Sequence, residues 1–474
     1  MSAQPYTISM ILLALAGSTV LLLVGVLLRQ VVPKLQSLHL PASVVAGLMA
    51  LVLGPEVLGP YLYQNTAAHE TIDEIYQIWK VLPAYLITVV FASLMMGGPI
   101  PNPKAIWRAA APHLMVGYIM AWGQYVVGVL VVMLVLAPAL DANILSSALI
   151  AIGFQGGYGT AAGLGSTYSQ LGFENGYDLA LGMATAGKVI AILLGLFLIN
   201  VAVKRNKLQA PEDSVKDHIK EDVPQNKANS DYRRQRREMH YSTDALVVHF
   251  SLLALAIAIG WGMKQGLLVF EGLFLAAEDE GFVQYIPLFP MALLGGIVVQ
   301  VMMRWLPKSH LIDPRRIQSL GHSFLDMIIL VAIATLSPKV LADNWQLLLA
   351  LVGAGVGWNL LVFLLVAPRI YNNAYWARGL ADFAHSTGAA TTGLMLIKVI
   401  DPNDQTGAKS GFSLKQPFYE PIVGGGLVTA LALPLMHVMG LGPFLVLTSV
   451  LLGVTIIAAW RLVGINRRNP VLDQ

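Results

Sequence analysis

Eleven apolar stretches, most of them about twenty residues or longer, follow one another along this chain of 474 residues. A helix needs about twenty apolar residues to cross a bilayer. Charged residues make up only 12% of the chain, whereas about a quarter is usual in soluble proteins. We therefore predict an all-α integral membrane protein. The expected spans lie near residues 8–28, 39–58, 81–99, 110–137, 177–203, 243–262, 283–303, 318–337, 345–367, 417–438 and 441–461.

Composition also limits the class of function. The net charge is only +3, so nothing points to nucleic acid as a partner. The sequence has no cysteine, which excludes disulfides and thiolate metal sites. The first stretch follows no basic segment and has no small-residue cleavage site after it. We therefore interpret residues 8–28 as a retained span and not as a signal peptide.

Lys and Arg residues indicate the orientation, because cytoplasmic loops of membrane proteins are enriched in them. With the N-terminus outside, the eleven spans place 26 of the 30 basic residues in the cytoplasm. Lys80, Lys264 and Lys339 then lie outside, and Lys188 falls within a span. We therefore expect an outer N-terminus and a cytoplasmic C-terminus.

The chain has the pattern of a duplication. PASVVAG (41–47) and PMALLGG (290–296) each open the second span of a half, and each half has a glycine-rich segment between its fourth and fifth spans. Five spans precede the charged segment 204–242, so the second half enters the membrane inverted. We predict a first repeat at 1–203 with a hairpin near 143–170, a cytoplasmic linker at 204–242, a second repeat at 243–440 with a hairpin near 379–400, and an extra span with a tail at 441–474.

The two glycine-rich segments are the candidate binding elements. Seven glycines lie between Gly153 and Gly172, and STGAATTG occupies 386–393. Irregular backbone survives in a membrane only where protein buries it or where it lines a polar cavity. Freed amides of such a turn suit a carboxylate, and hydroxyl oxygens suit sodium. The alternative is that small residues only let helices pack closely.

The motifs GGYGTAAG, LGFENGYDLALGMATAGKV and STGAATTG resemble the bacterial sodium/glutamate symporter family. The resemblance implies inverted five-span repeats with re-entrant hairpins, a homodimer, elevator-type movement and sodium-coupled uptake of an acidic amino acid, with no cofactor besides the coupling ion. The resemblance supports Gly156, Gly157, Gly159, Thr160, Gly388 and Thr392 as substrate-binding residues, and we add Tyr158, Lys188, Ser386 and Thr387 as candidates from the same segments. The sodium candidates are Thr160, Ser166, Asp382 and Thr391.

Two departures from the family pattern leave the substrate open. Tyr158 stands where the family motif has His, and Asp382, His385 and Ser386 replace a more glycine-rich second hairpin. These side chains lie where substrate would be chosen. An ion-coupled carrier of another small organic anion, a di- or hydroxycarboxylate, therefore remains the alternative to a glutamate carrier.

Charged residues inside spans are functional candidates by default. Aligning the two hairpins places Lys188 near Glu420, so we expect Lys188 to approach Glu420 or to contact a substrate carboxylate; the alternative is that Lys188 lies along a water-filled crevice. His322 and Asp326 share a helix face, as packing residues or as a cation site. Asp382 either binds a cation or caps a half-helix beginning at Ser386, and capping is favoured.

Other classes of function find little support. GMATAGK (182–188) begins like a phosphate-binding loop, but Val189 replaces the required Ser or Thr and no strand precedes it. Metalloprotease, paired-aspartate and nucleophile-elbow motifs are absent from the sequence, so we do not expect an enzyme. Broken helices of opposite polarity favour alternating access over the continuous pore of a channel.

Overall fold

The computed structural model is helical, with no strand, over the residues that it describes: 6–32, 41–63, 66, 68–97, 103–205, 243–274, 281–305, 313–371 and 373–468. Residues 206–242 of the predicted linker lie outside this set. The first half contains α1 (Ile8–Val31), α3 (Ala42–Leu53), α4 (Gly59–Leu62), α5 (His69–Leu94), α6 (Pro103–Val131), η1 (Val132–Leu136), α7 (Ala137–Leu140), η2 (Ile144–Ala148), α8 (Leu149–Phe154), α9 (Gly157–Gly163), α10 (Gly165–Gln170) and α11 (Gly176–Lys204). The second half contains α13 (Thr243–Gly272), η5 (Val283–Tyr285), α14 (Leu288–Trp305), α15 (Pro314–Ala334), α16 (Pro338–Asp343), α17 (Trp345–Leu361), η7 (Val362–Val366), α18 (Ala367–Ile370), α19 (Tyr375–Gly388), α20 (Ala390–Ile400), α21 (Ala408–Tyr419), α22 (Leu427–Met439) and α23 (Leu441–Arg468).

Nine helices in the described part of the chain are long and apolar enough to cross a membrane, compared with the eleven predicted. The described part of the second predicted span holds the 12-residue helix α3, which ends before Gly54. The prediction of one continuous span over 417–438 is wrong, because α21 ends at Tyr419 and α22 begins at Leu427. Pro421 lacks an amide hydrogen, and Gly425 has a φ of 101°, so a regular helix cannot continue through this segment.

The two halves share an order of elements. In each half a long helix passes into a π-helical turn, η1 after α6 and η7 after α17, and an Ala-Pro pair follows at Ala137 and Ala367. A broken segment comes next in both halves. The two halves thus share this order, while the duplication and the inverted arrangement stay predictions.

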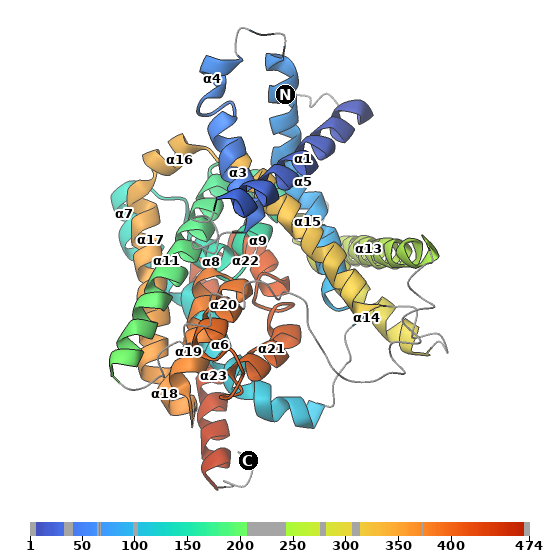
Figure 1. Ribbon diagram of the computed structural model, residues 1–474. Helices are drawn as coiled ribbons and strands as arrows, with labels where there is room; N and C mark the ends of the chain where they lie inside the picture. Colours follow the sequence, from blue (N-terminus) through green and yellow to red (C-terminus); the bar gives the residue numbers. More distant parts are fainter. Residues whose placement is uncertain are drawn as a thin grey trace.

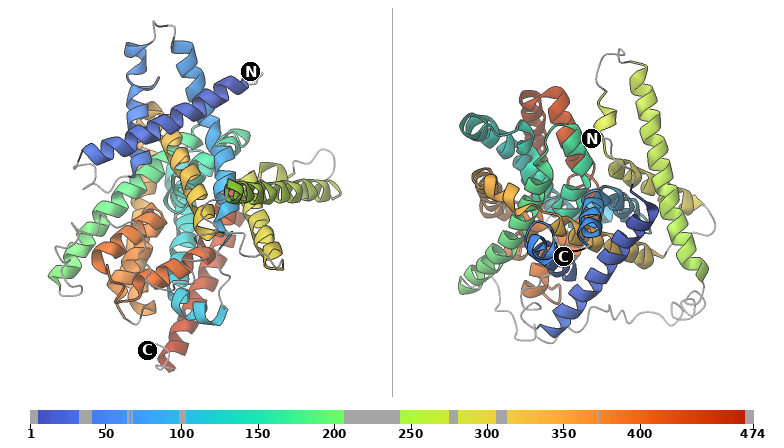
Figure 2. Two further views of the ribbon diagram at one scale, coloured as in Figure 1. Left: turned by 45° about the vertical axis from the view of Figure 1, so that its right-hand side comes forward. Right: turned by 90° about the horizontal axis from the view of Figure 1, so that it is seen from above.

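The helices form two groups. We call α1, α3, α5, α13, α14 and α15 the α5 bundle: α5 packs against α14 and α15, α3 against α1 and α15, and α13 against α14. We call α6, α8–α11, α17 and α19–α23 the hairpin bundle, in which α6 contacts α17, α19, α21 and α23. Figures 1 and 2 show α13 on the outer side of the α5 bundle, away from α19. Three helices from the beginning of each half thus build one bundle, and later helices of both halves build the other.

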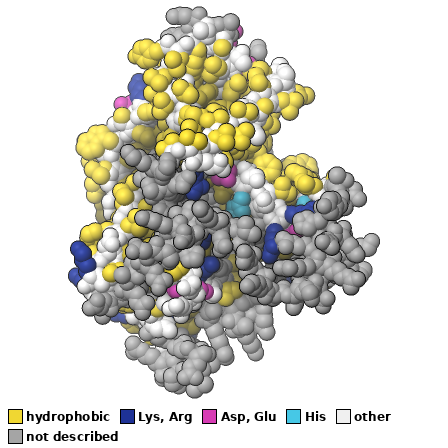
Figure 3. All heavy atoms as spheres, viewed as in Figure 1, with side chains coloured by type: hydrophobic (Ala, Val, Ile, Leu, Met, Phe, Trp, Pro, Cys, Tyr) yellow, Lys and Arg dark blue, Asp and Glu magenta, His cyan; other side chains and the backbone are white. Residues whose placement is uncertain are grey.

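Hydrophobic side chains also cover much of the outer surface. Leu12 on α1 is 61% exposed, and in Figure 3 such side chains spread over the upper part of the face, where Figure 1 shows α1, α3 and α5. Soluble proteins rarely expose continuous apolar surfaces of this extent. The arrangement therefore agrees with a multi-pass membrane protein.

The two bundles meet along α9 and α10, which pack on α5, and α9 also contacts α15. A Cβ atom on Gly159 would lie 3.1 Å from both Ile87 and Leu325, and one on Gly163 would lie 2.8 Å from Ile87. The absence of side chains at these two positions lets the bundles approach closely. Packing on small residues, the alternative reading of the glycine-rich segment, thus applies to this part of it.

Candidate functional site

The first hairpin turns between α8 and α9. The backbone bends at Gln155 and Gly156, and Gly157 has a φ of 60°, a conformation that a β-carbon would strain. Gly156 has an ordinary φ of −79°, but a Cβ there would lie 2.6 Å from the Thr160 Cβ. Only Gly157 is therefore required by backbone conformation, whereas a close contact within the turn disfavours a side chain at Gly156.

The second hairpin consists of α19 and α20 and turns at Ala389, whose φ is 80°. The helix α19 begins at Tyr375 and continues to Gly388, so the expectation that a half-helix begins at Ser386 is wrong. Asp382 lies in the middle of α19 and caps nothing. The helix extends further than expected because every residue from Gly379 to Gly388 is buried by neighbouring helices, which stabilise it despite its small residues.

A third break, absent from the sequence prediction, separates α21 from α22 at residues 420–426. The Thr160 hydroxyl of the first hairpin donates a hydrogen bond of 3.0 Å to the Gly425 carbonyl of this break. A Cβ on Gly425 would lie 2.5 Å from the Thr160 Oγ1. Pro421 followed by Gly424, Gly425 and Gly426 was the sequence signal for a broken helix, but the apolar residues around it suggested a continuous span.

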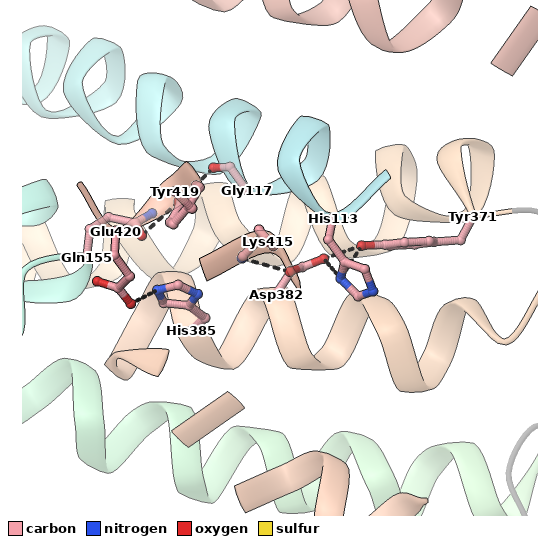
Figure 4. A network of polar contacts seen from close by, with 9 residues as sticks. All are labelled: His113, Gly117, Gln155, Tyr371, Asp382, His385, Lys415, Tyr419 and Glu420. Carbon is pink, nitrogen blue, oxygen red and sulfur yellow. Dashed lines mark hydrogen bonds and ion pairs between the residues drawn. The ribbon is translucent and has the colours of Figure 1, made fainter. Parts of the chain in front are cut away.

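Polar side chains from the first hairpin, the second hairpin and the third break converge at one place (Figure 4). The Tyr419 hydroxyl lies 2.9 Å from Gln155 Oε1 and 3.0 Å from the Gly117 carbonyl. His385 Nε2 lies 3.3 Å from Glu420 Oε1, an ion-pair distance without the direction of a hydrogen bond. His385 and Tyr419 are fully buried, while the Glu420 side chain is 22% exposed. We call this group (Gln155, His385, Ser386, Tyr419, Glu420) the junction cluster.

Four atoms of the junction cluster are buried without a hydrogen-bonded partner in the described structure: Gln155 Nε2, His385 Nδ1, His385 Nε2 and Ser386 Oγ. Ser386 Oγ interacts with the nearby Tyr419 hydroxyl, but without hydrogen-bond geometry. Buried polar atoms are normally paired, and each exception calls for an explanation. The junction cluster therefore has unused hydrogen-bonding capacity for a ligand.

The other predicted hydroxyls of the second hairpin are already used. The Thr387 hydroxyl donates to the Phe383 carbonyl at 2.8 Å, and the Thr392 hydroxyl donates to the Gly388 carbonyl at 2.7 Å. Asn359 of α17 donates to Thr387 Oγ1 at 3.0 Å, and Gln124 of α6 donates to the Ser386 carbonyl at 2.6 Å. Thr387 and Thr392 therefore hold the shape of the hairpin, and Ser386 is the hydroxyl left for another partner.

Asp382 belongs to a separate, fully buried ionic network. The Lys415 ammonium lies 2.9 Å from Asp382 Oδ1, His113 Nδ1 lies 2.9 Å from Oδ2, and the Tyr371 hydroxyl donates to the same Oδ2. Lys415 also lies over the rings of Phe412 and Tyr419. Both oxygens of the predicted sodium ligand Asp382 are thus occupied by protein groups, with a lysine ammonium in the place of a cation.

Lys188 lies apart from Glu420. Its ammonium is 5.7 Å from the ring centroid of Tyr158, whose hydroxyl donates to Thr185 Oγ1 at 3.1 Å. Within the described residues no ion pair joins Lys188 to Glu420, which is paired with His385. The Asp326 carboxylate of α15 attracts the Lys188 ammonium, and Ser43 of α3 donates to Asp326 Oδ1 at 2.7 Å. Lys188 therefore faces the α5 bundle.

The four predicted sodium ligands are not brought together. Thr160 is buried at the third break, and Asp382 is buried beside Lys415. Ser166 and Thr391 are both exposed. Gly388, predicted to bind substrate, instead packs its backbone against Lys188: a Cβ on Gly388 would lie 3.0 Å from the Lys188 Cα. Among the described residues no group of three or more His, Cys, Asp or Glu side chains could hold a metal ion.

The sequence analysis missed His113, Lys415, Tyr419 and Gln155. Lys415 falls before the tenth predicted span, and the other three look like ordinary polar or aromatic residues of apolar helices. Their partners lie far away in the chain; Gln155 and Tyr419, for instance, are separated by 264 positions. Only the tertiary structure could have identified them.

A family model described as sodium/glutamate symporter matches residues 7–400, well over half of the chain. No curated protein matches the chain. The family match contains both hairpins and ends at Ile400, so the third break and the residues Lys415, Tyr419 and Glu420 lie beyond it.

Proposed function

The chain belongs to the sodium/glutamate symporter family, and we propose that it carries glutamate or a related acidic amino acid together with sodium. The observation that supports this most strongly is the junction cluster, where three interrupted helices meet and four buried polar atoms have no hydrogen-bonded partner. In secondary transporters, broken helices supply the polar groups that bind substrate. A polar substrate at the junction cluster would provide the missing partners.

The chemistry of the cluster suits a molecule that carries both an amino group and carboxylates. Gln155 Nε2 and the Ser386 hydroxyl are donors, which suits a carboxylate. When His385 Nε2 carries a proton toward Glu420, the neutral ring presents Nδ1 as an acceptor, and Glu420 adds a negative charge. Both groups suit an ammonium. A dicarboxylate without an amino group would leave Glu420 unmatched, which favours an acidic amino acid over the alternative substrates.

Sodium is proposed to bind next to this cluster. Thr160 Oγ1 and the Gly425 carbonyl lie 3.0 Å apart and are oxygen ligands of the kind that hard cations prefer. Thr160 is the predicted sodium ligand that contacts the third break. A cation there would join the first hairpin to α22 and would stabilise the arrangement that binds substrate.

Alternating access is proposed to come from movement of the hairpin bundle against the α5 bundle. The contact between them includes Gly159 and Gly163 against the apolar side chains of Ile87 and Leu325, which form no hydrogen bonds that movement would have to break. The full proposal includes inverted repeats, an elevator-type mechanism, a homodimer, and insertion in the bacterial inner membrane with the N-terminus outside.

Uptake of labelled glutamate into proteoliposomes tests this function. Accumulation should depend on an inward sodium gradient and should be inhibited at least about tenfold more strongly by unlabelled aspartate than by succinate, since one unmatched charge changes affinity by roughly this factor. Sodium-dependent uptake of a plain dicarboxylate instead of glutamate would support the alternative carrier. Absence of sodium-dependent transport of either substrate would refute the proposal.

The variant Ser386→Ala tests the site itself. It should raise the KM for glutamate about tenfold, as expected for the loss of one hydrogen bond to a charged group, without lowering the melting temperature. Ser413→Ala is the matched control, because Ser413 is exposed on α21. An unchanged KM in Ser386→Ala would remove the junction cluster as the substrate site.

A further inference from the structure

A cavity with charged and hydroxyl side chains among its lining residues lies between the two bundles, and it includes no residue of the junction cluster. It has a volume of about 490 Å³, within the range of small-molecule sites. One wall is α5, with Lys80 and Thr88, and the opposite wall is the α9–α10 limb of the first hairpin, with Ser166 and Thr167. Lys264 of α13 closes one side.

The cavity brings together two of the three lysines that the charge rule places outside the membrane. Lys80 is exposed on α5, and Lys264 is half-buried, with its ammonium donating to the Ile286 carbonyl at 2.6 Å. This hydrogen bond uses one of the three N–H groups of Lys264, so the others can bind a ligand. Two cationic groups from different helices thus line one small space.

Two carboxylates complete the lining. Glu174 is exposed, and Asp178 accepts a hydrogen bond of 2.7 Å from the Ser337 amide. Lys80 attracts Asp178. Two ammonium groups, two carboxylates and several hydroxyls match a molecule with two carboxylates and one amino group. A simple anion would use only half of this pattern.

The position of the cavity indicates its role. Its lining follows the first hairpin from Gly163, near the middle of the bundle, to Glu174 beyond the end of α10. In the expected orientation this limb leads from the outer surface toward the Gly157 turn and the junction cluster. A solute that enters from outside along the hairpin would therefore pass through the cavity.

We propose that this cavity is an outer binding site that holds an acidic amino acid before it reaches the junction cluster. Lys80 and Lys264 bind its two carboxylates, and Glu174 and Asp178 attract its amino group. The inference rests on the proposed transport function. Charged groups around a cleft raise the local concentration of a complementary solute, so the site increases the rate of substrate capture and is distinct from the sodium-dependent site.

The absence of cysteine permits a direct test that does not need transport. Ser166→Cys places a single thiol in the cavity, and Thr66→Cys places one on an exposed outer segment as a control. Each purified variant is treated with an anionic methanethiosulfonate reagent in sodium-free potassium buffer. Millimolar glutamate should slow labelling of Ser166→Cys at least about threefold and leave Thr66→Cys unchanged, because the sodium-dependent site is not loaded under these conditions.

Removal of the lysines tests the proposed contacts. Lys80→Gln and Lys264→Gln, each added to Ser166→Cys, should abolish most of the protection by glutamate and slow the anionic reagent about fivefold, the effect of one charge at close range. Lys339→Gln removes the third outer lysine, which is exposed and does not line the cavity. If Lys339→Gln has the same effect as the other two, or if glutamate protects nothing, the outer site is refuted.

The two proposals fail differently. Sodium-dependent uptake without protection of Ser166→Cys would overturn the outer site and keep the transport function. Protection without uptake by the unaltered protein would keep the outer site and overturn the transport function. For the variants in transport, the KM for glutamate should rise about fivefold in Lys80→Gln and in Lys264→Gln with an unchanged maximal rate, since capture and not the later movement is affected.

Discussion

Replacing Lys415 by methionine would leave the carboxylate of Asp382 buried without its cation. Both side chains are fully buried, and the ammonium lies 2.9 Å from Asp382 Oδ1. Removal of one partner of a buried ion pair costs about 3–5 kcal/mol, because the remaining charge has no solvent to stabilise it. His113 and Tyr371 stay beside Asp382, but both already contact its other oxygen, so they cannot replace the ammonium at Oδ1.

This free energy converts into a measurable shift of the melting temperature. At about 2 °C per kcal/mol for a larger protein, Lys415→Met should lower the melting temperature in detergent by roughly 6–10 °C. Lys409→Met is the matched control, because Lys409 lies on the same helix α21 with an exposed side chain, and it should shift the melting temperature by less than about 1 °C.

A double variant separates the charge effect from the loss of packing. Asp382→Asn added to Lys415→Met removes the uncompensated charge, so the double variant should melt higher than Lys415→Met alone, with a coupling free energy of about 1–3 kcal/mol. If the losses of stability in Lys415→Met and in Asp382→Asn alone add up in the double variant, the two residues do not depend on each other. That result, or a shift of less than about 2 °C in Lys415→Met, would refute the reasoning that they form a buried ion pair.

Two further predictions concern the hairpins. Gly425→Ala should lower the melting temperature by several degrees and abolish sodium-dependent uptake, because its Cβ would lie 2.5 Å from the Thr160 Oγ1. Gly440→Ala is the control, since its φ is also positive but no atom lies within 4 Å, and its uptake should persist. Equal loss of uptake in both would show that backbone strain alone is responsible. Lys188→Met should raise the KM for glutamate or slow transport at least about fivefold at an unchanged protein level, while Lys204→Met at the exposed end of α11 should do neither. If Lys188→Met has wild-type kinetics, Lys188 has no role in transport and only occupies the space between the bundles.

Local sequence patterns were sufficient for most of the helices. The apolar stretch at 177–203 corresponds to α11, observed at Gly176–Lys204, because hydrophobic length alone decides whether a helix crosses a membrane. The first hairpin was also predicted from its glycines, and it turns at Gly157, whose φ of 60° favours glycine. The tenth span was predicted wrongly: apolar residues around Gly424–Gly426 have the composition of a span, and only the structure showed that α21 ends at Tyr419 and α22 begins at Leu427.

The sequence by itself determined that the protein is a helical membrane protein with two interrupted segments, because length, hydrophobicity and glycine content act locally. The tertiary structure decided which polar residues meet. Lys188 faces Asp326 and Tyr158 instead of Glu420, Asp382 pairs with Lys415 instead of capping a helix, and Ser386 keeps an unused hydroxyl. Such choices depend on burial and on contacts between distant helices, where the cost of an unpaired charge or hydrogen bond is set by the whole surrounding structure and by no single segment.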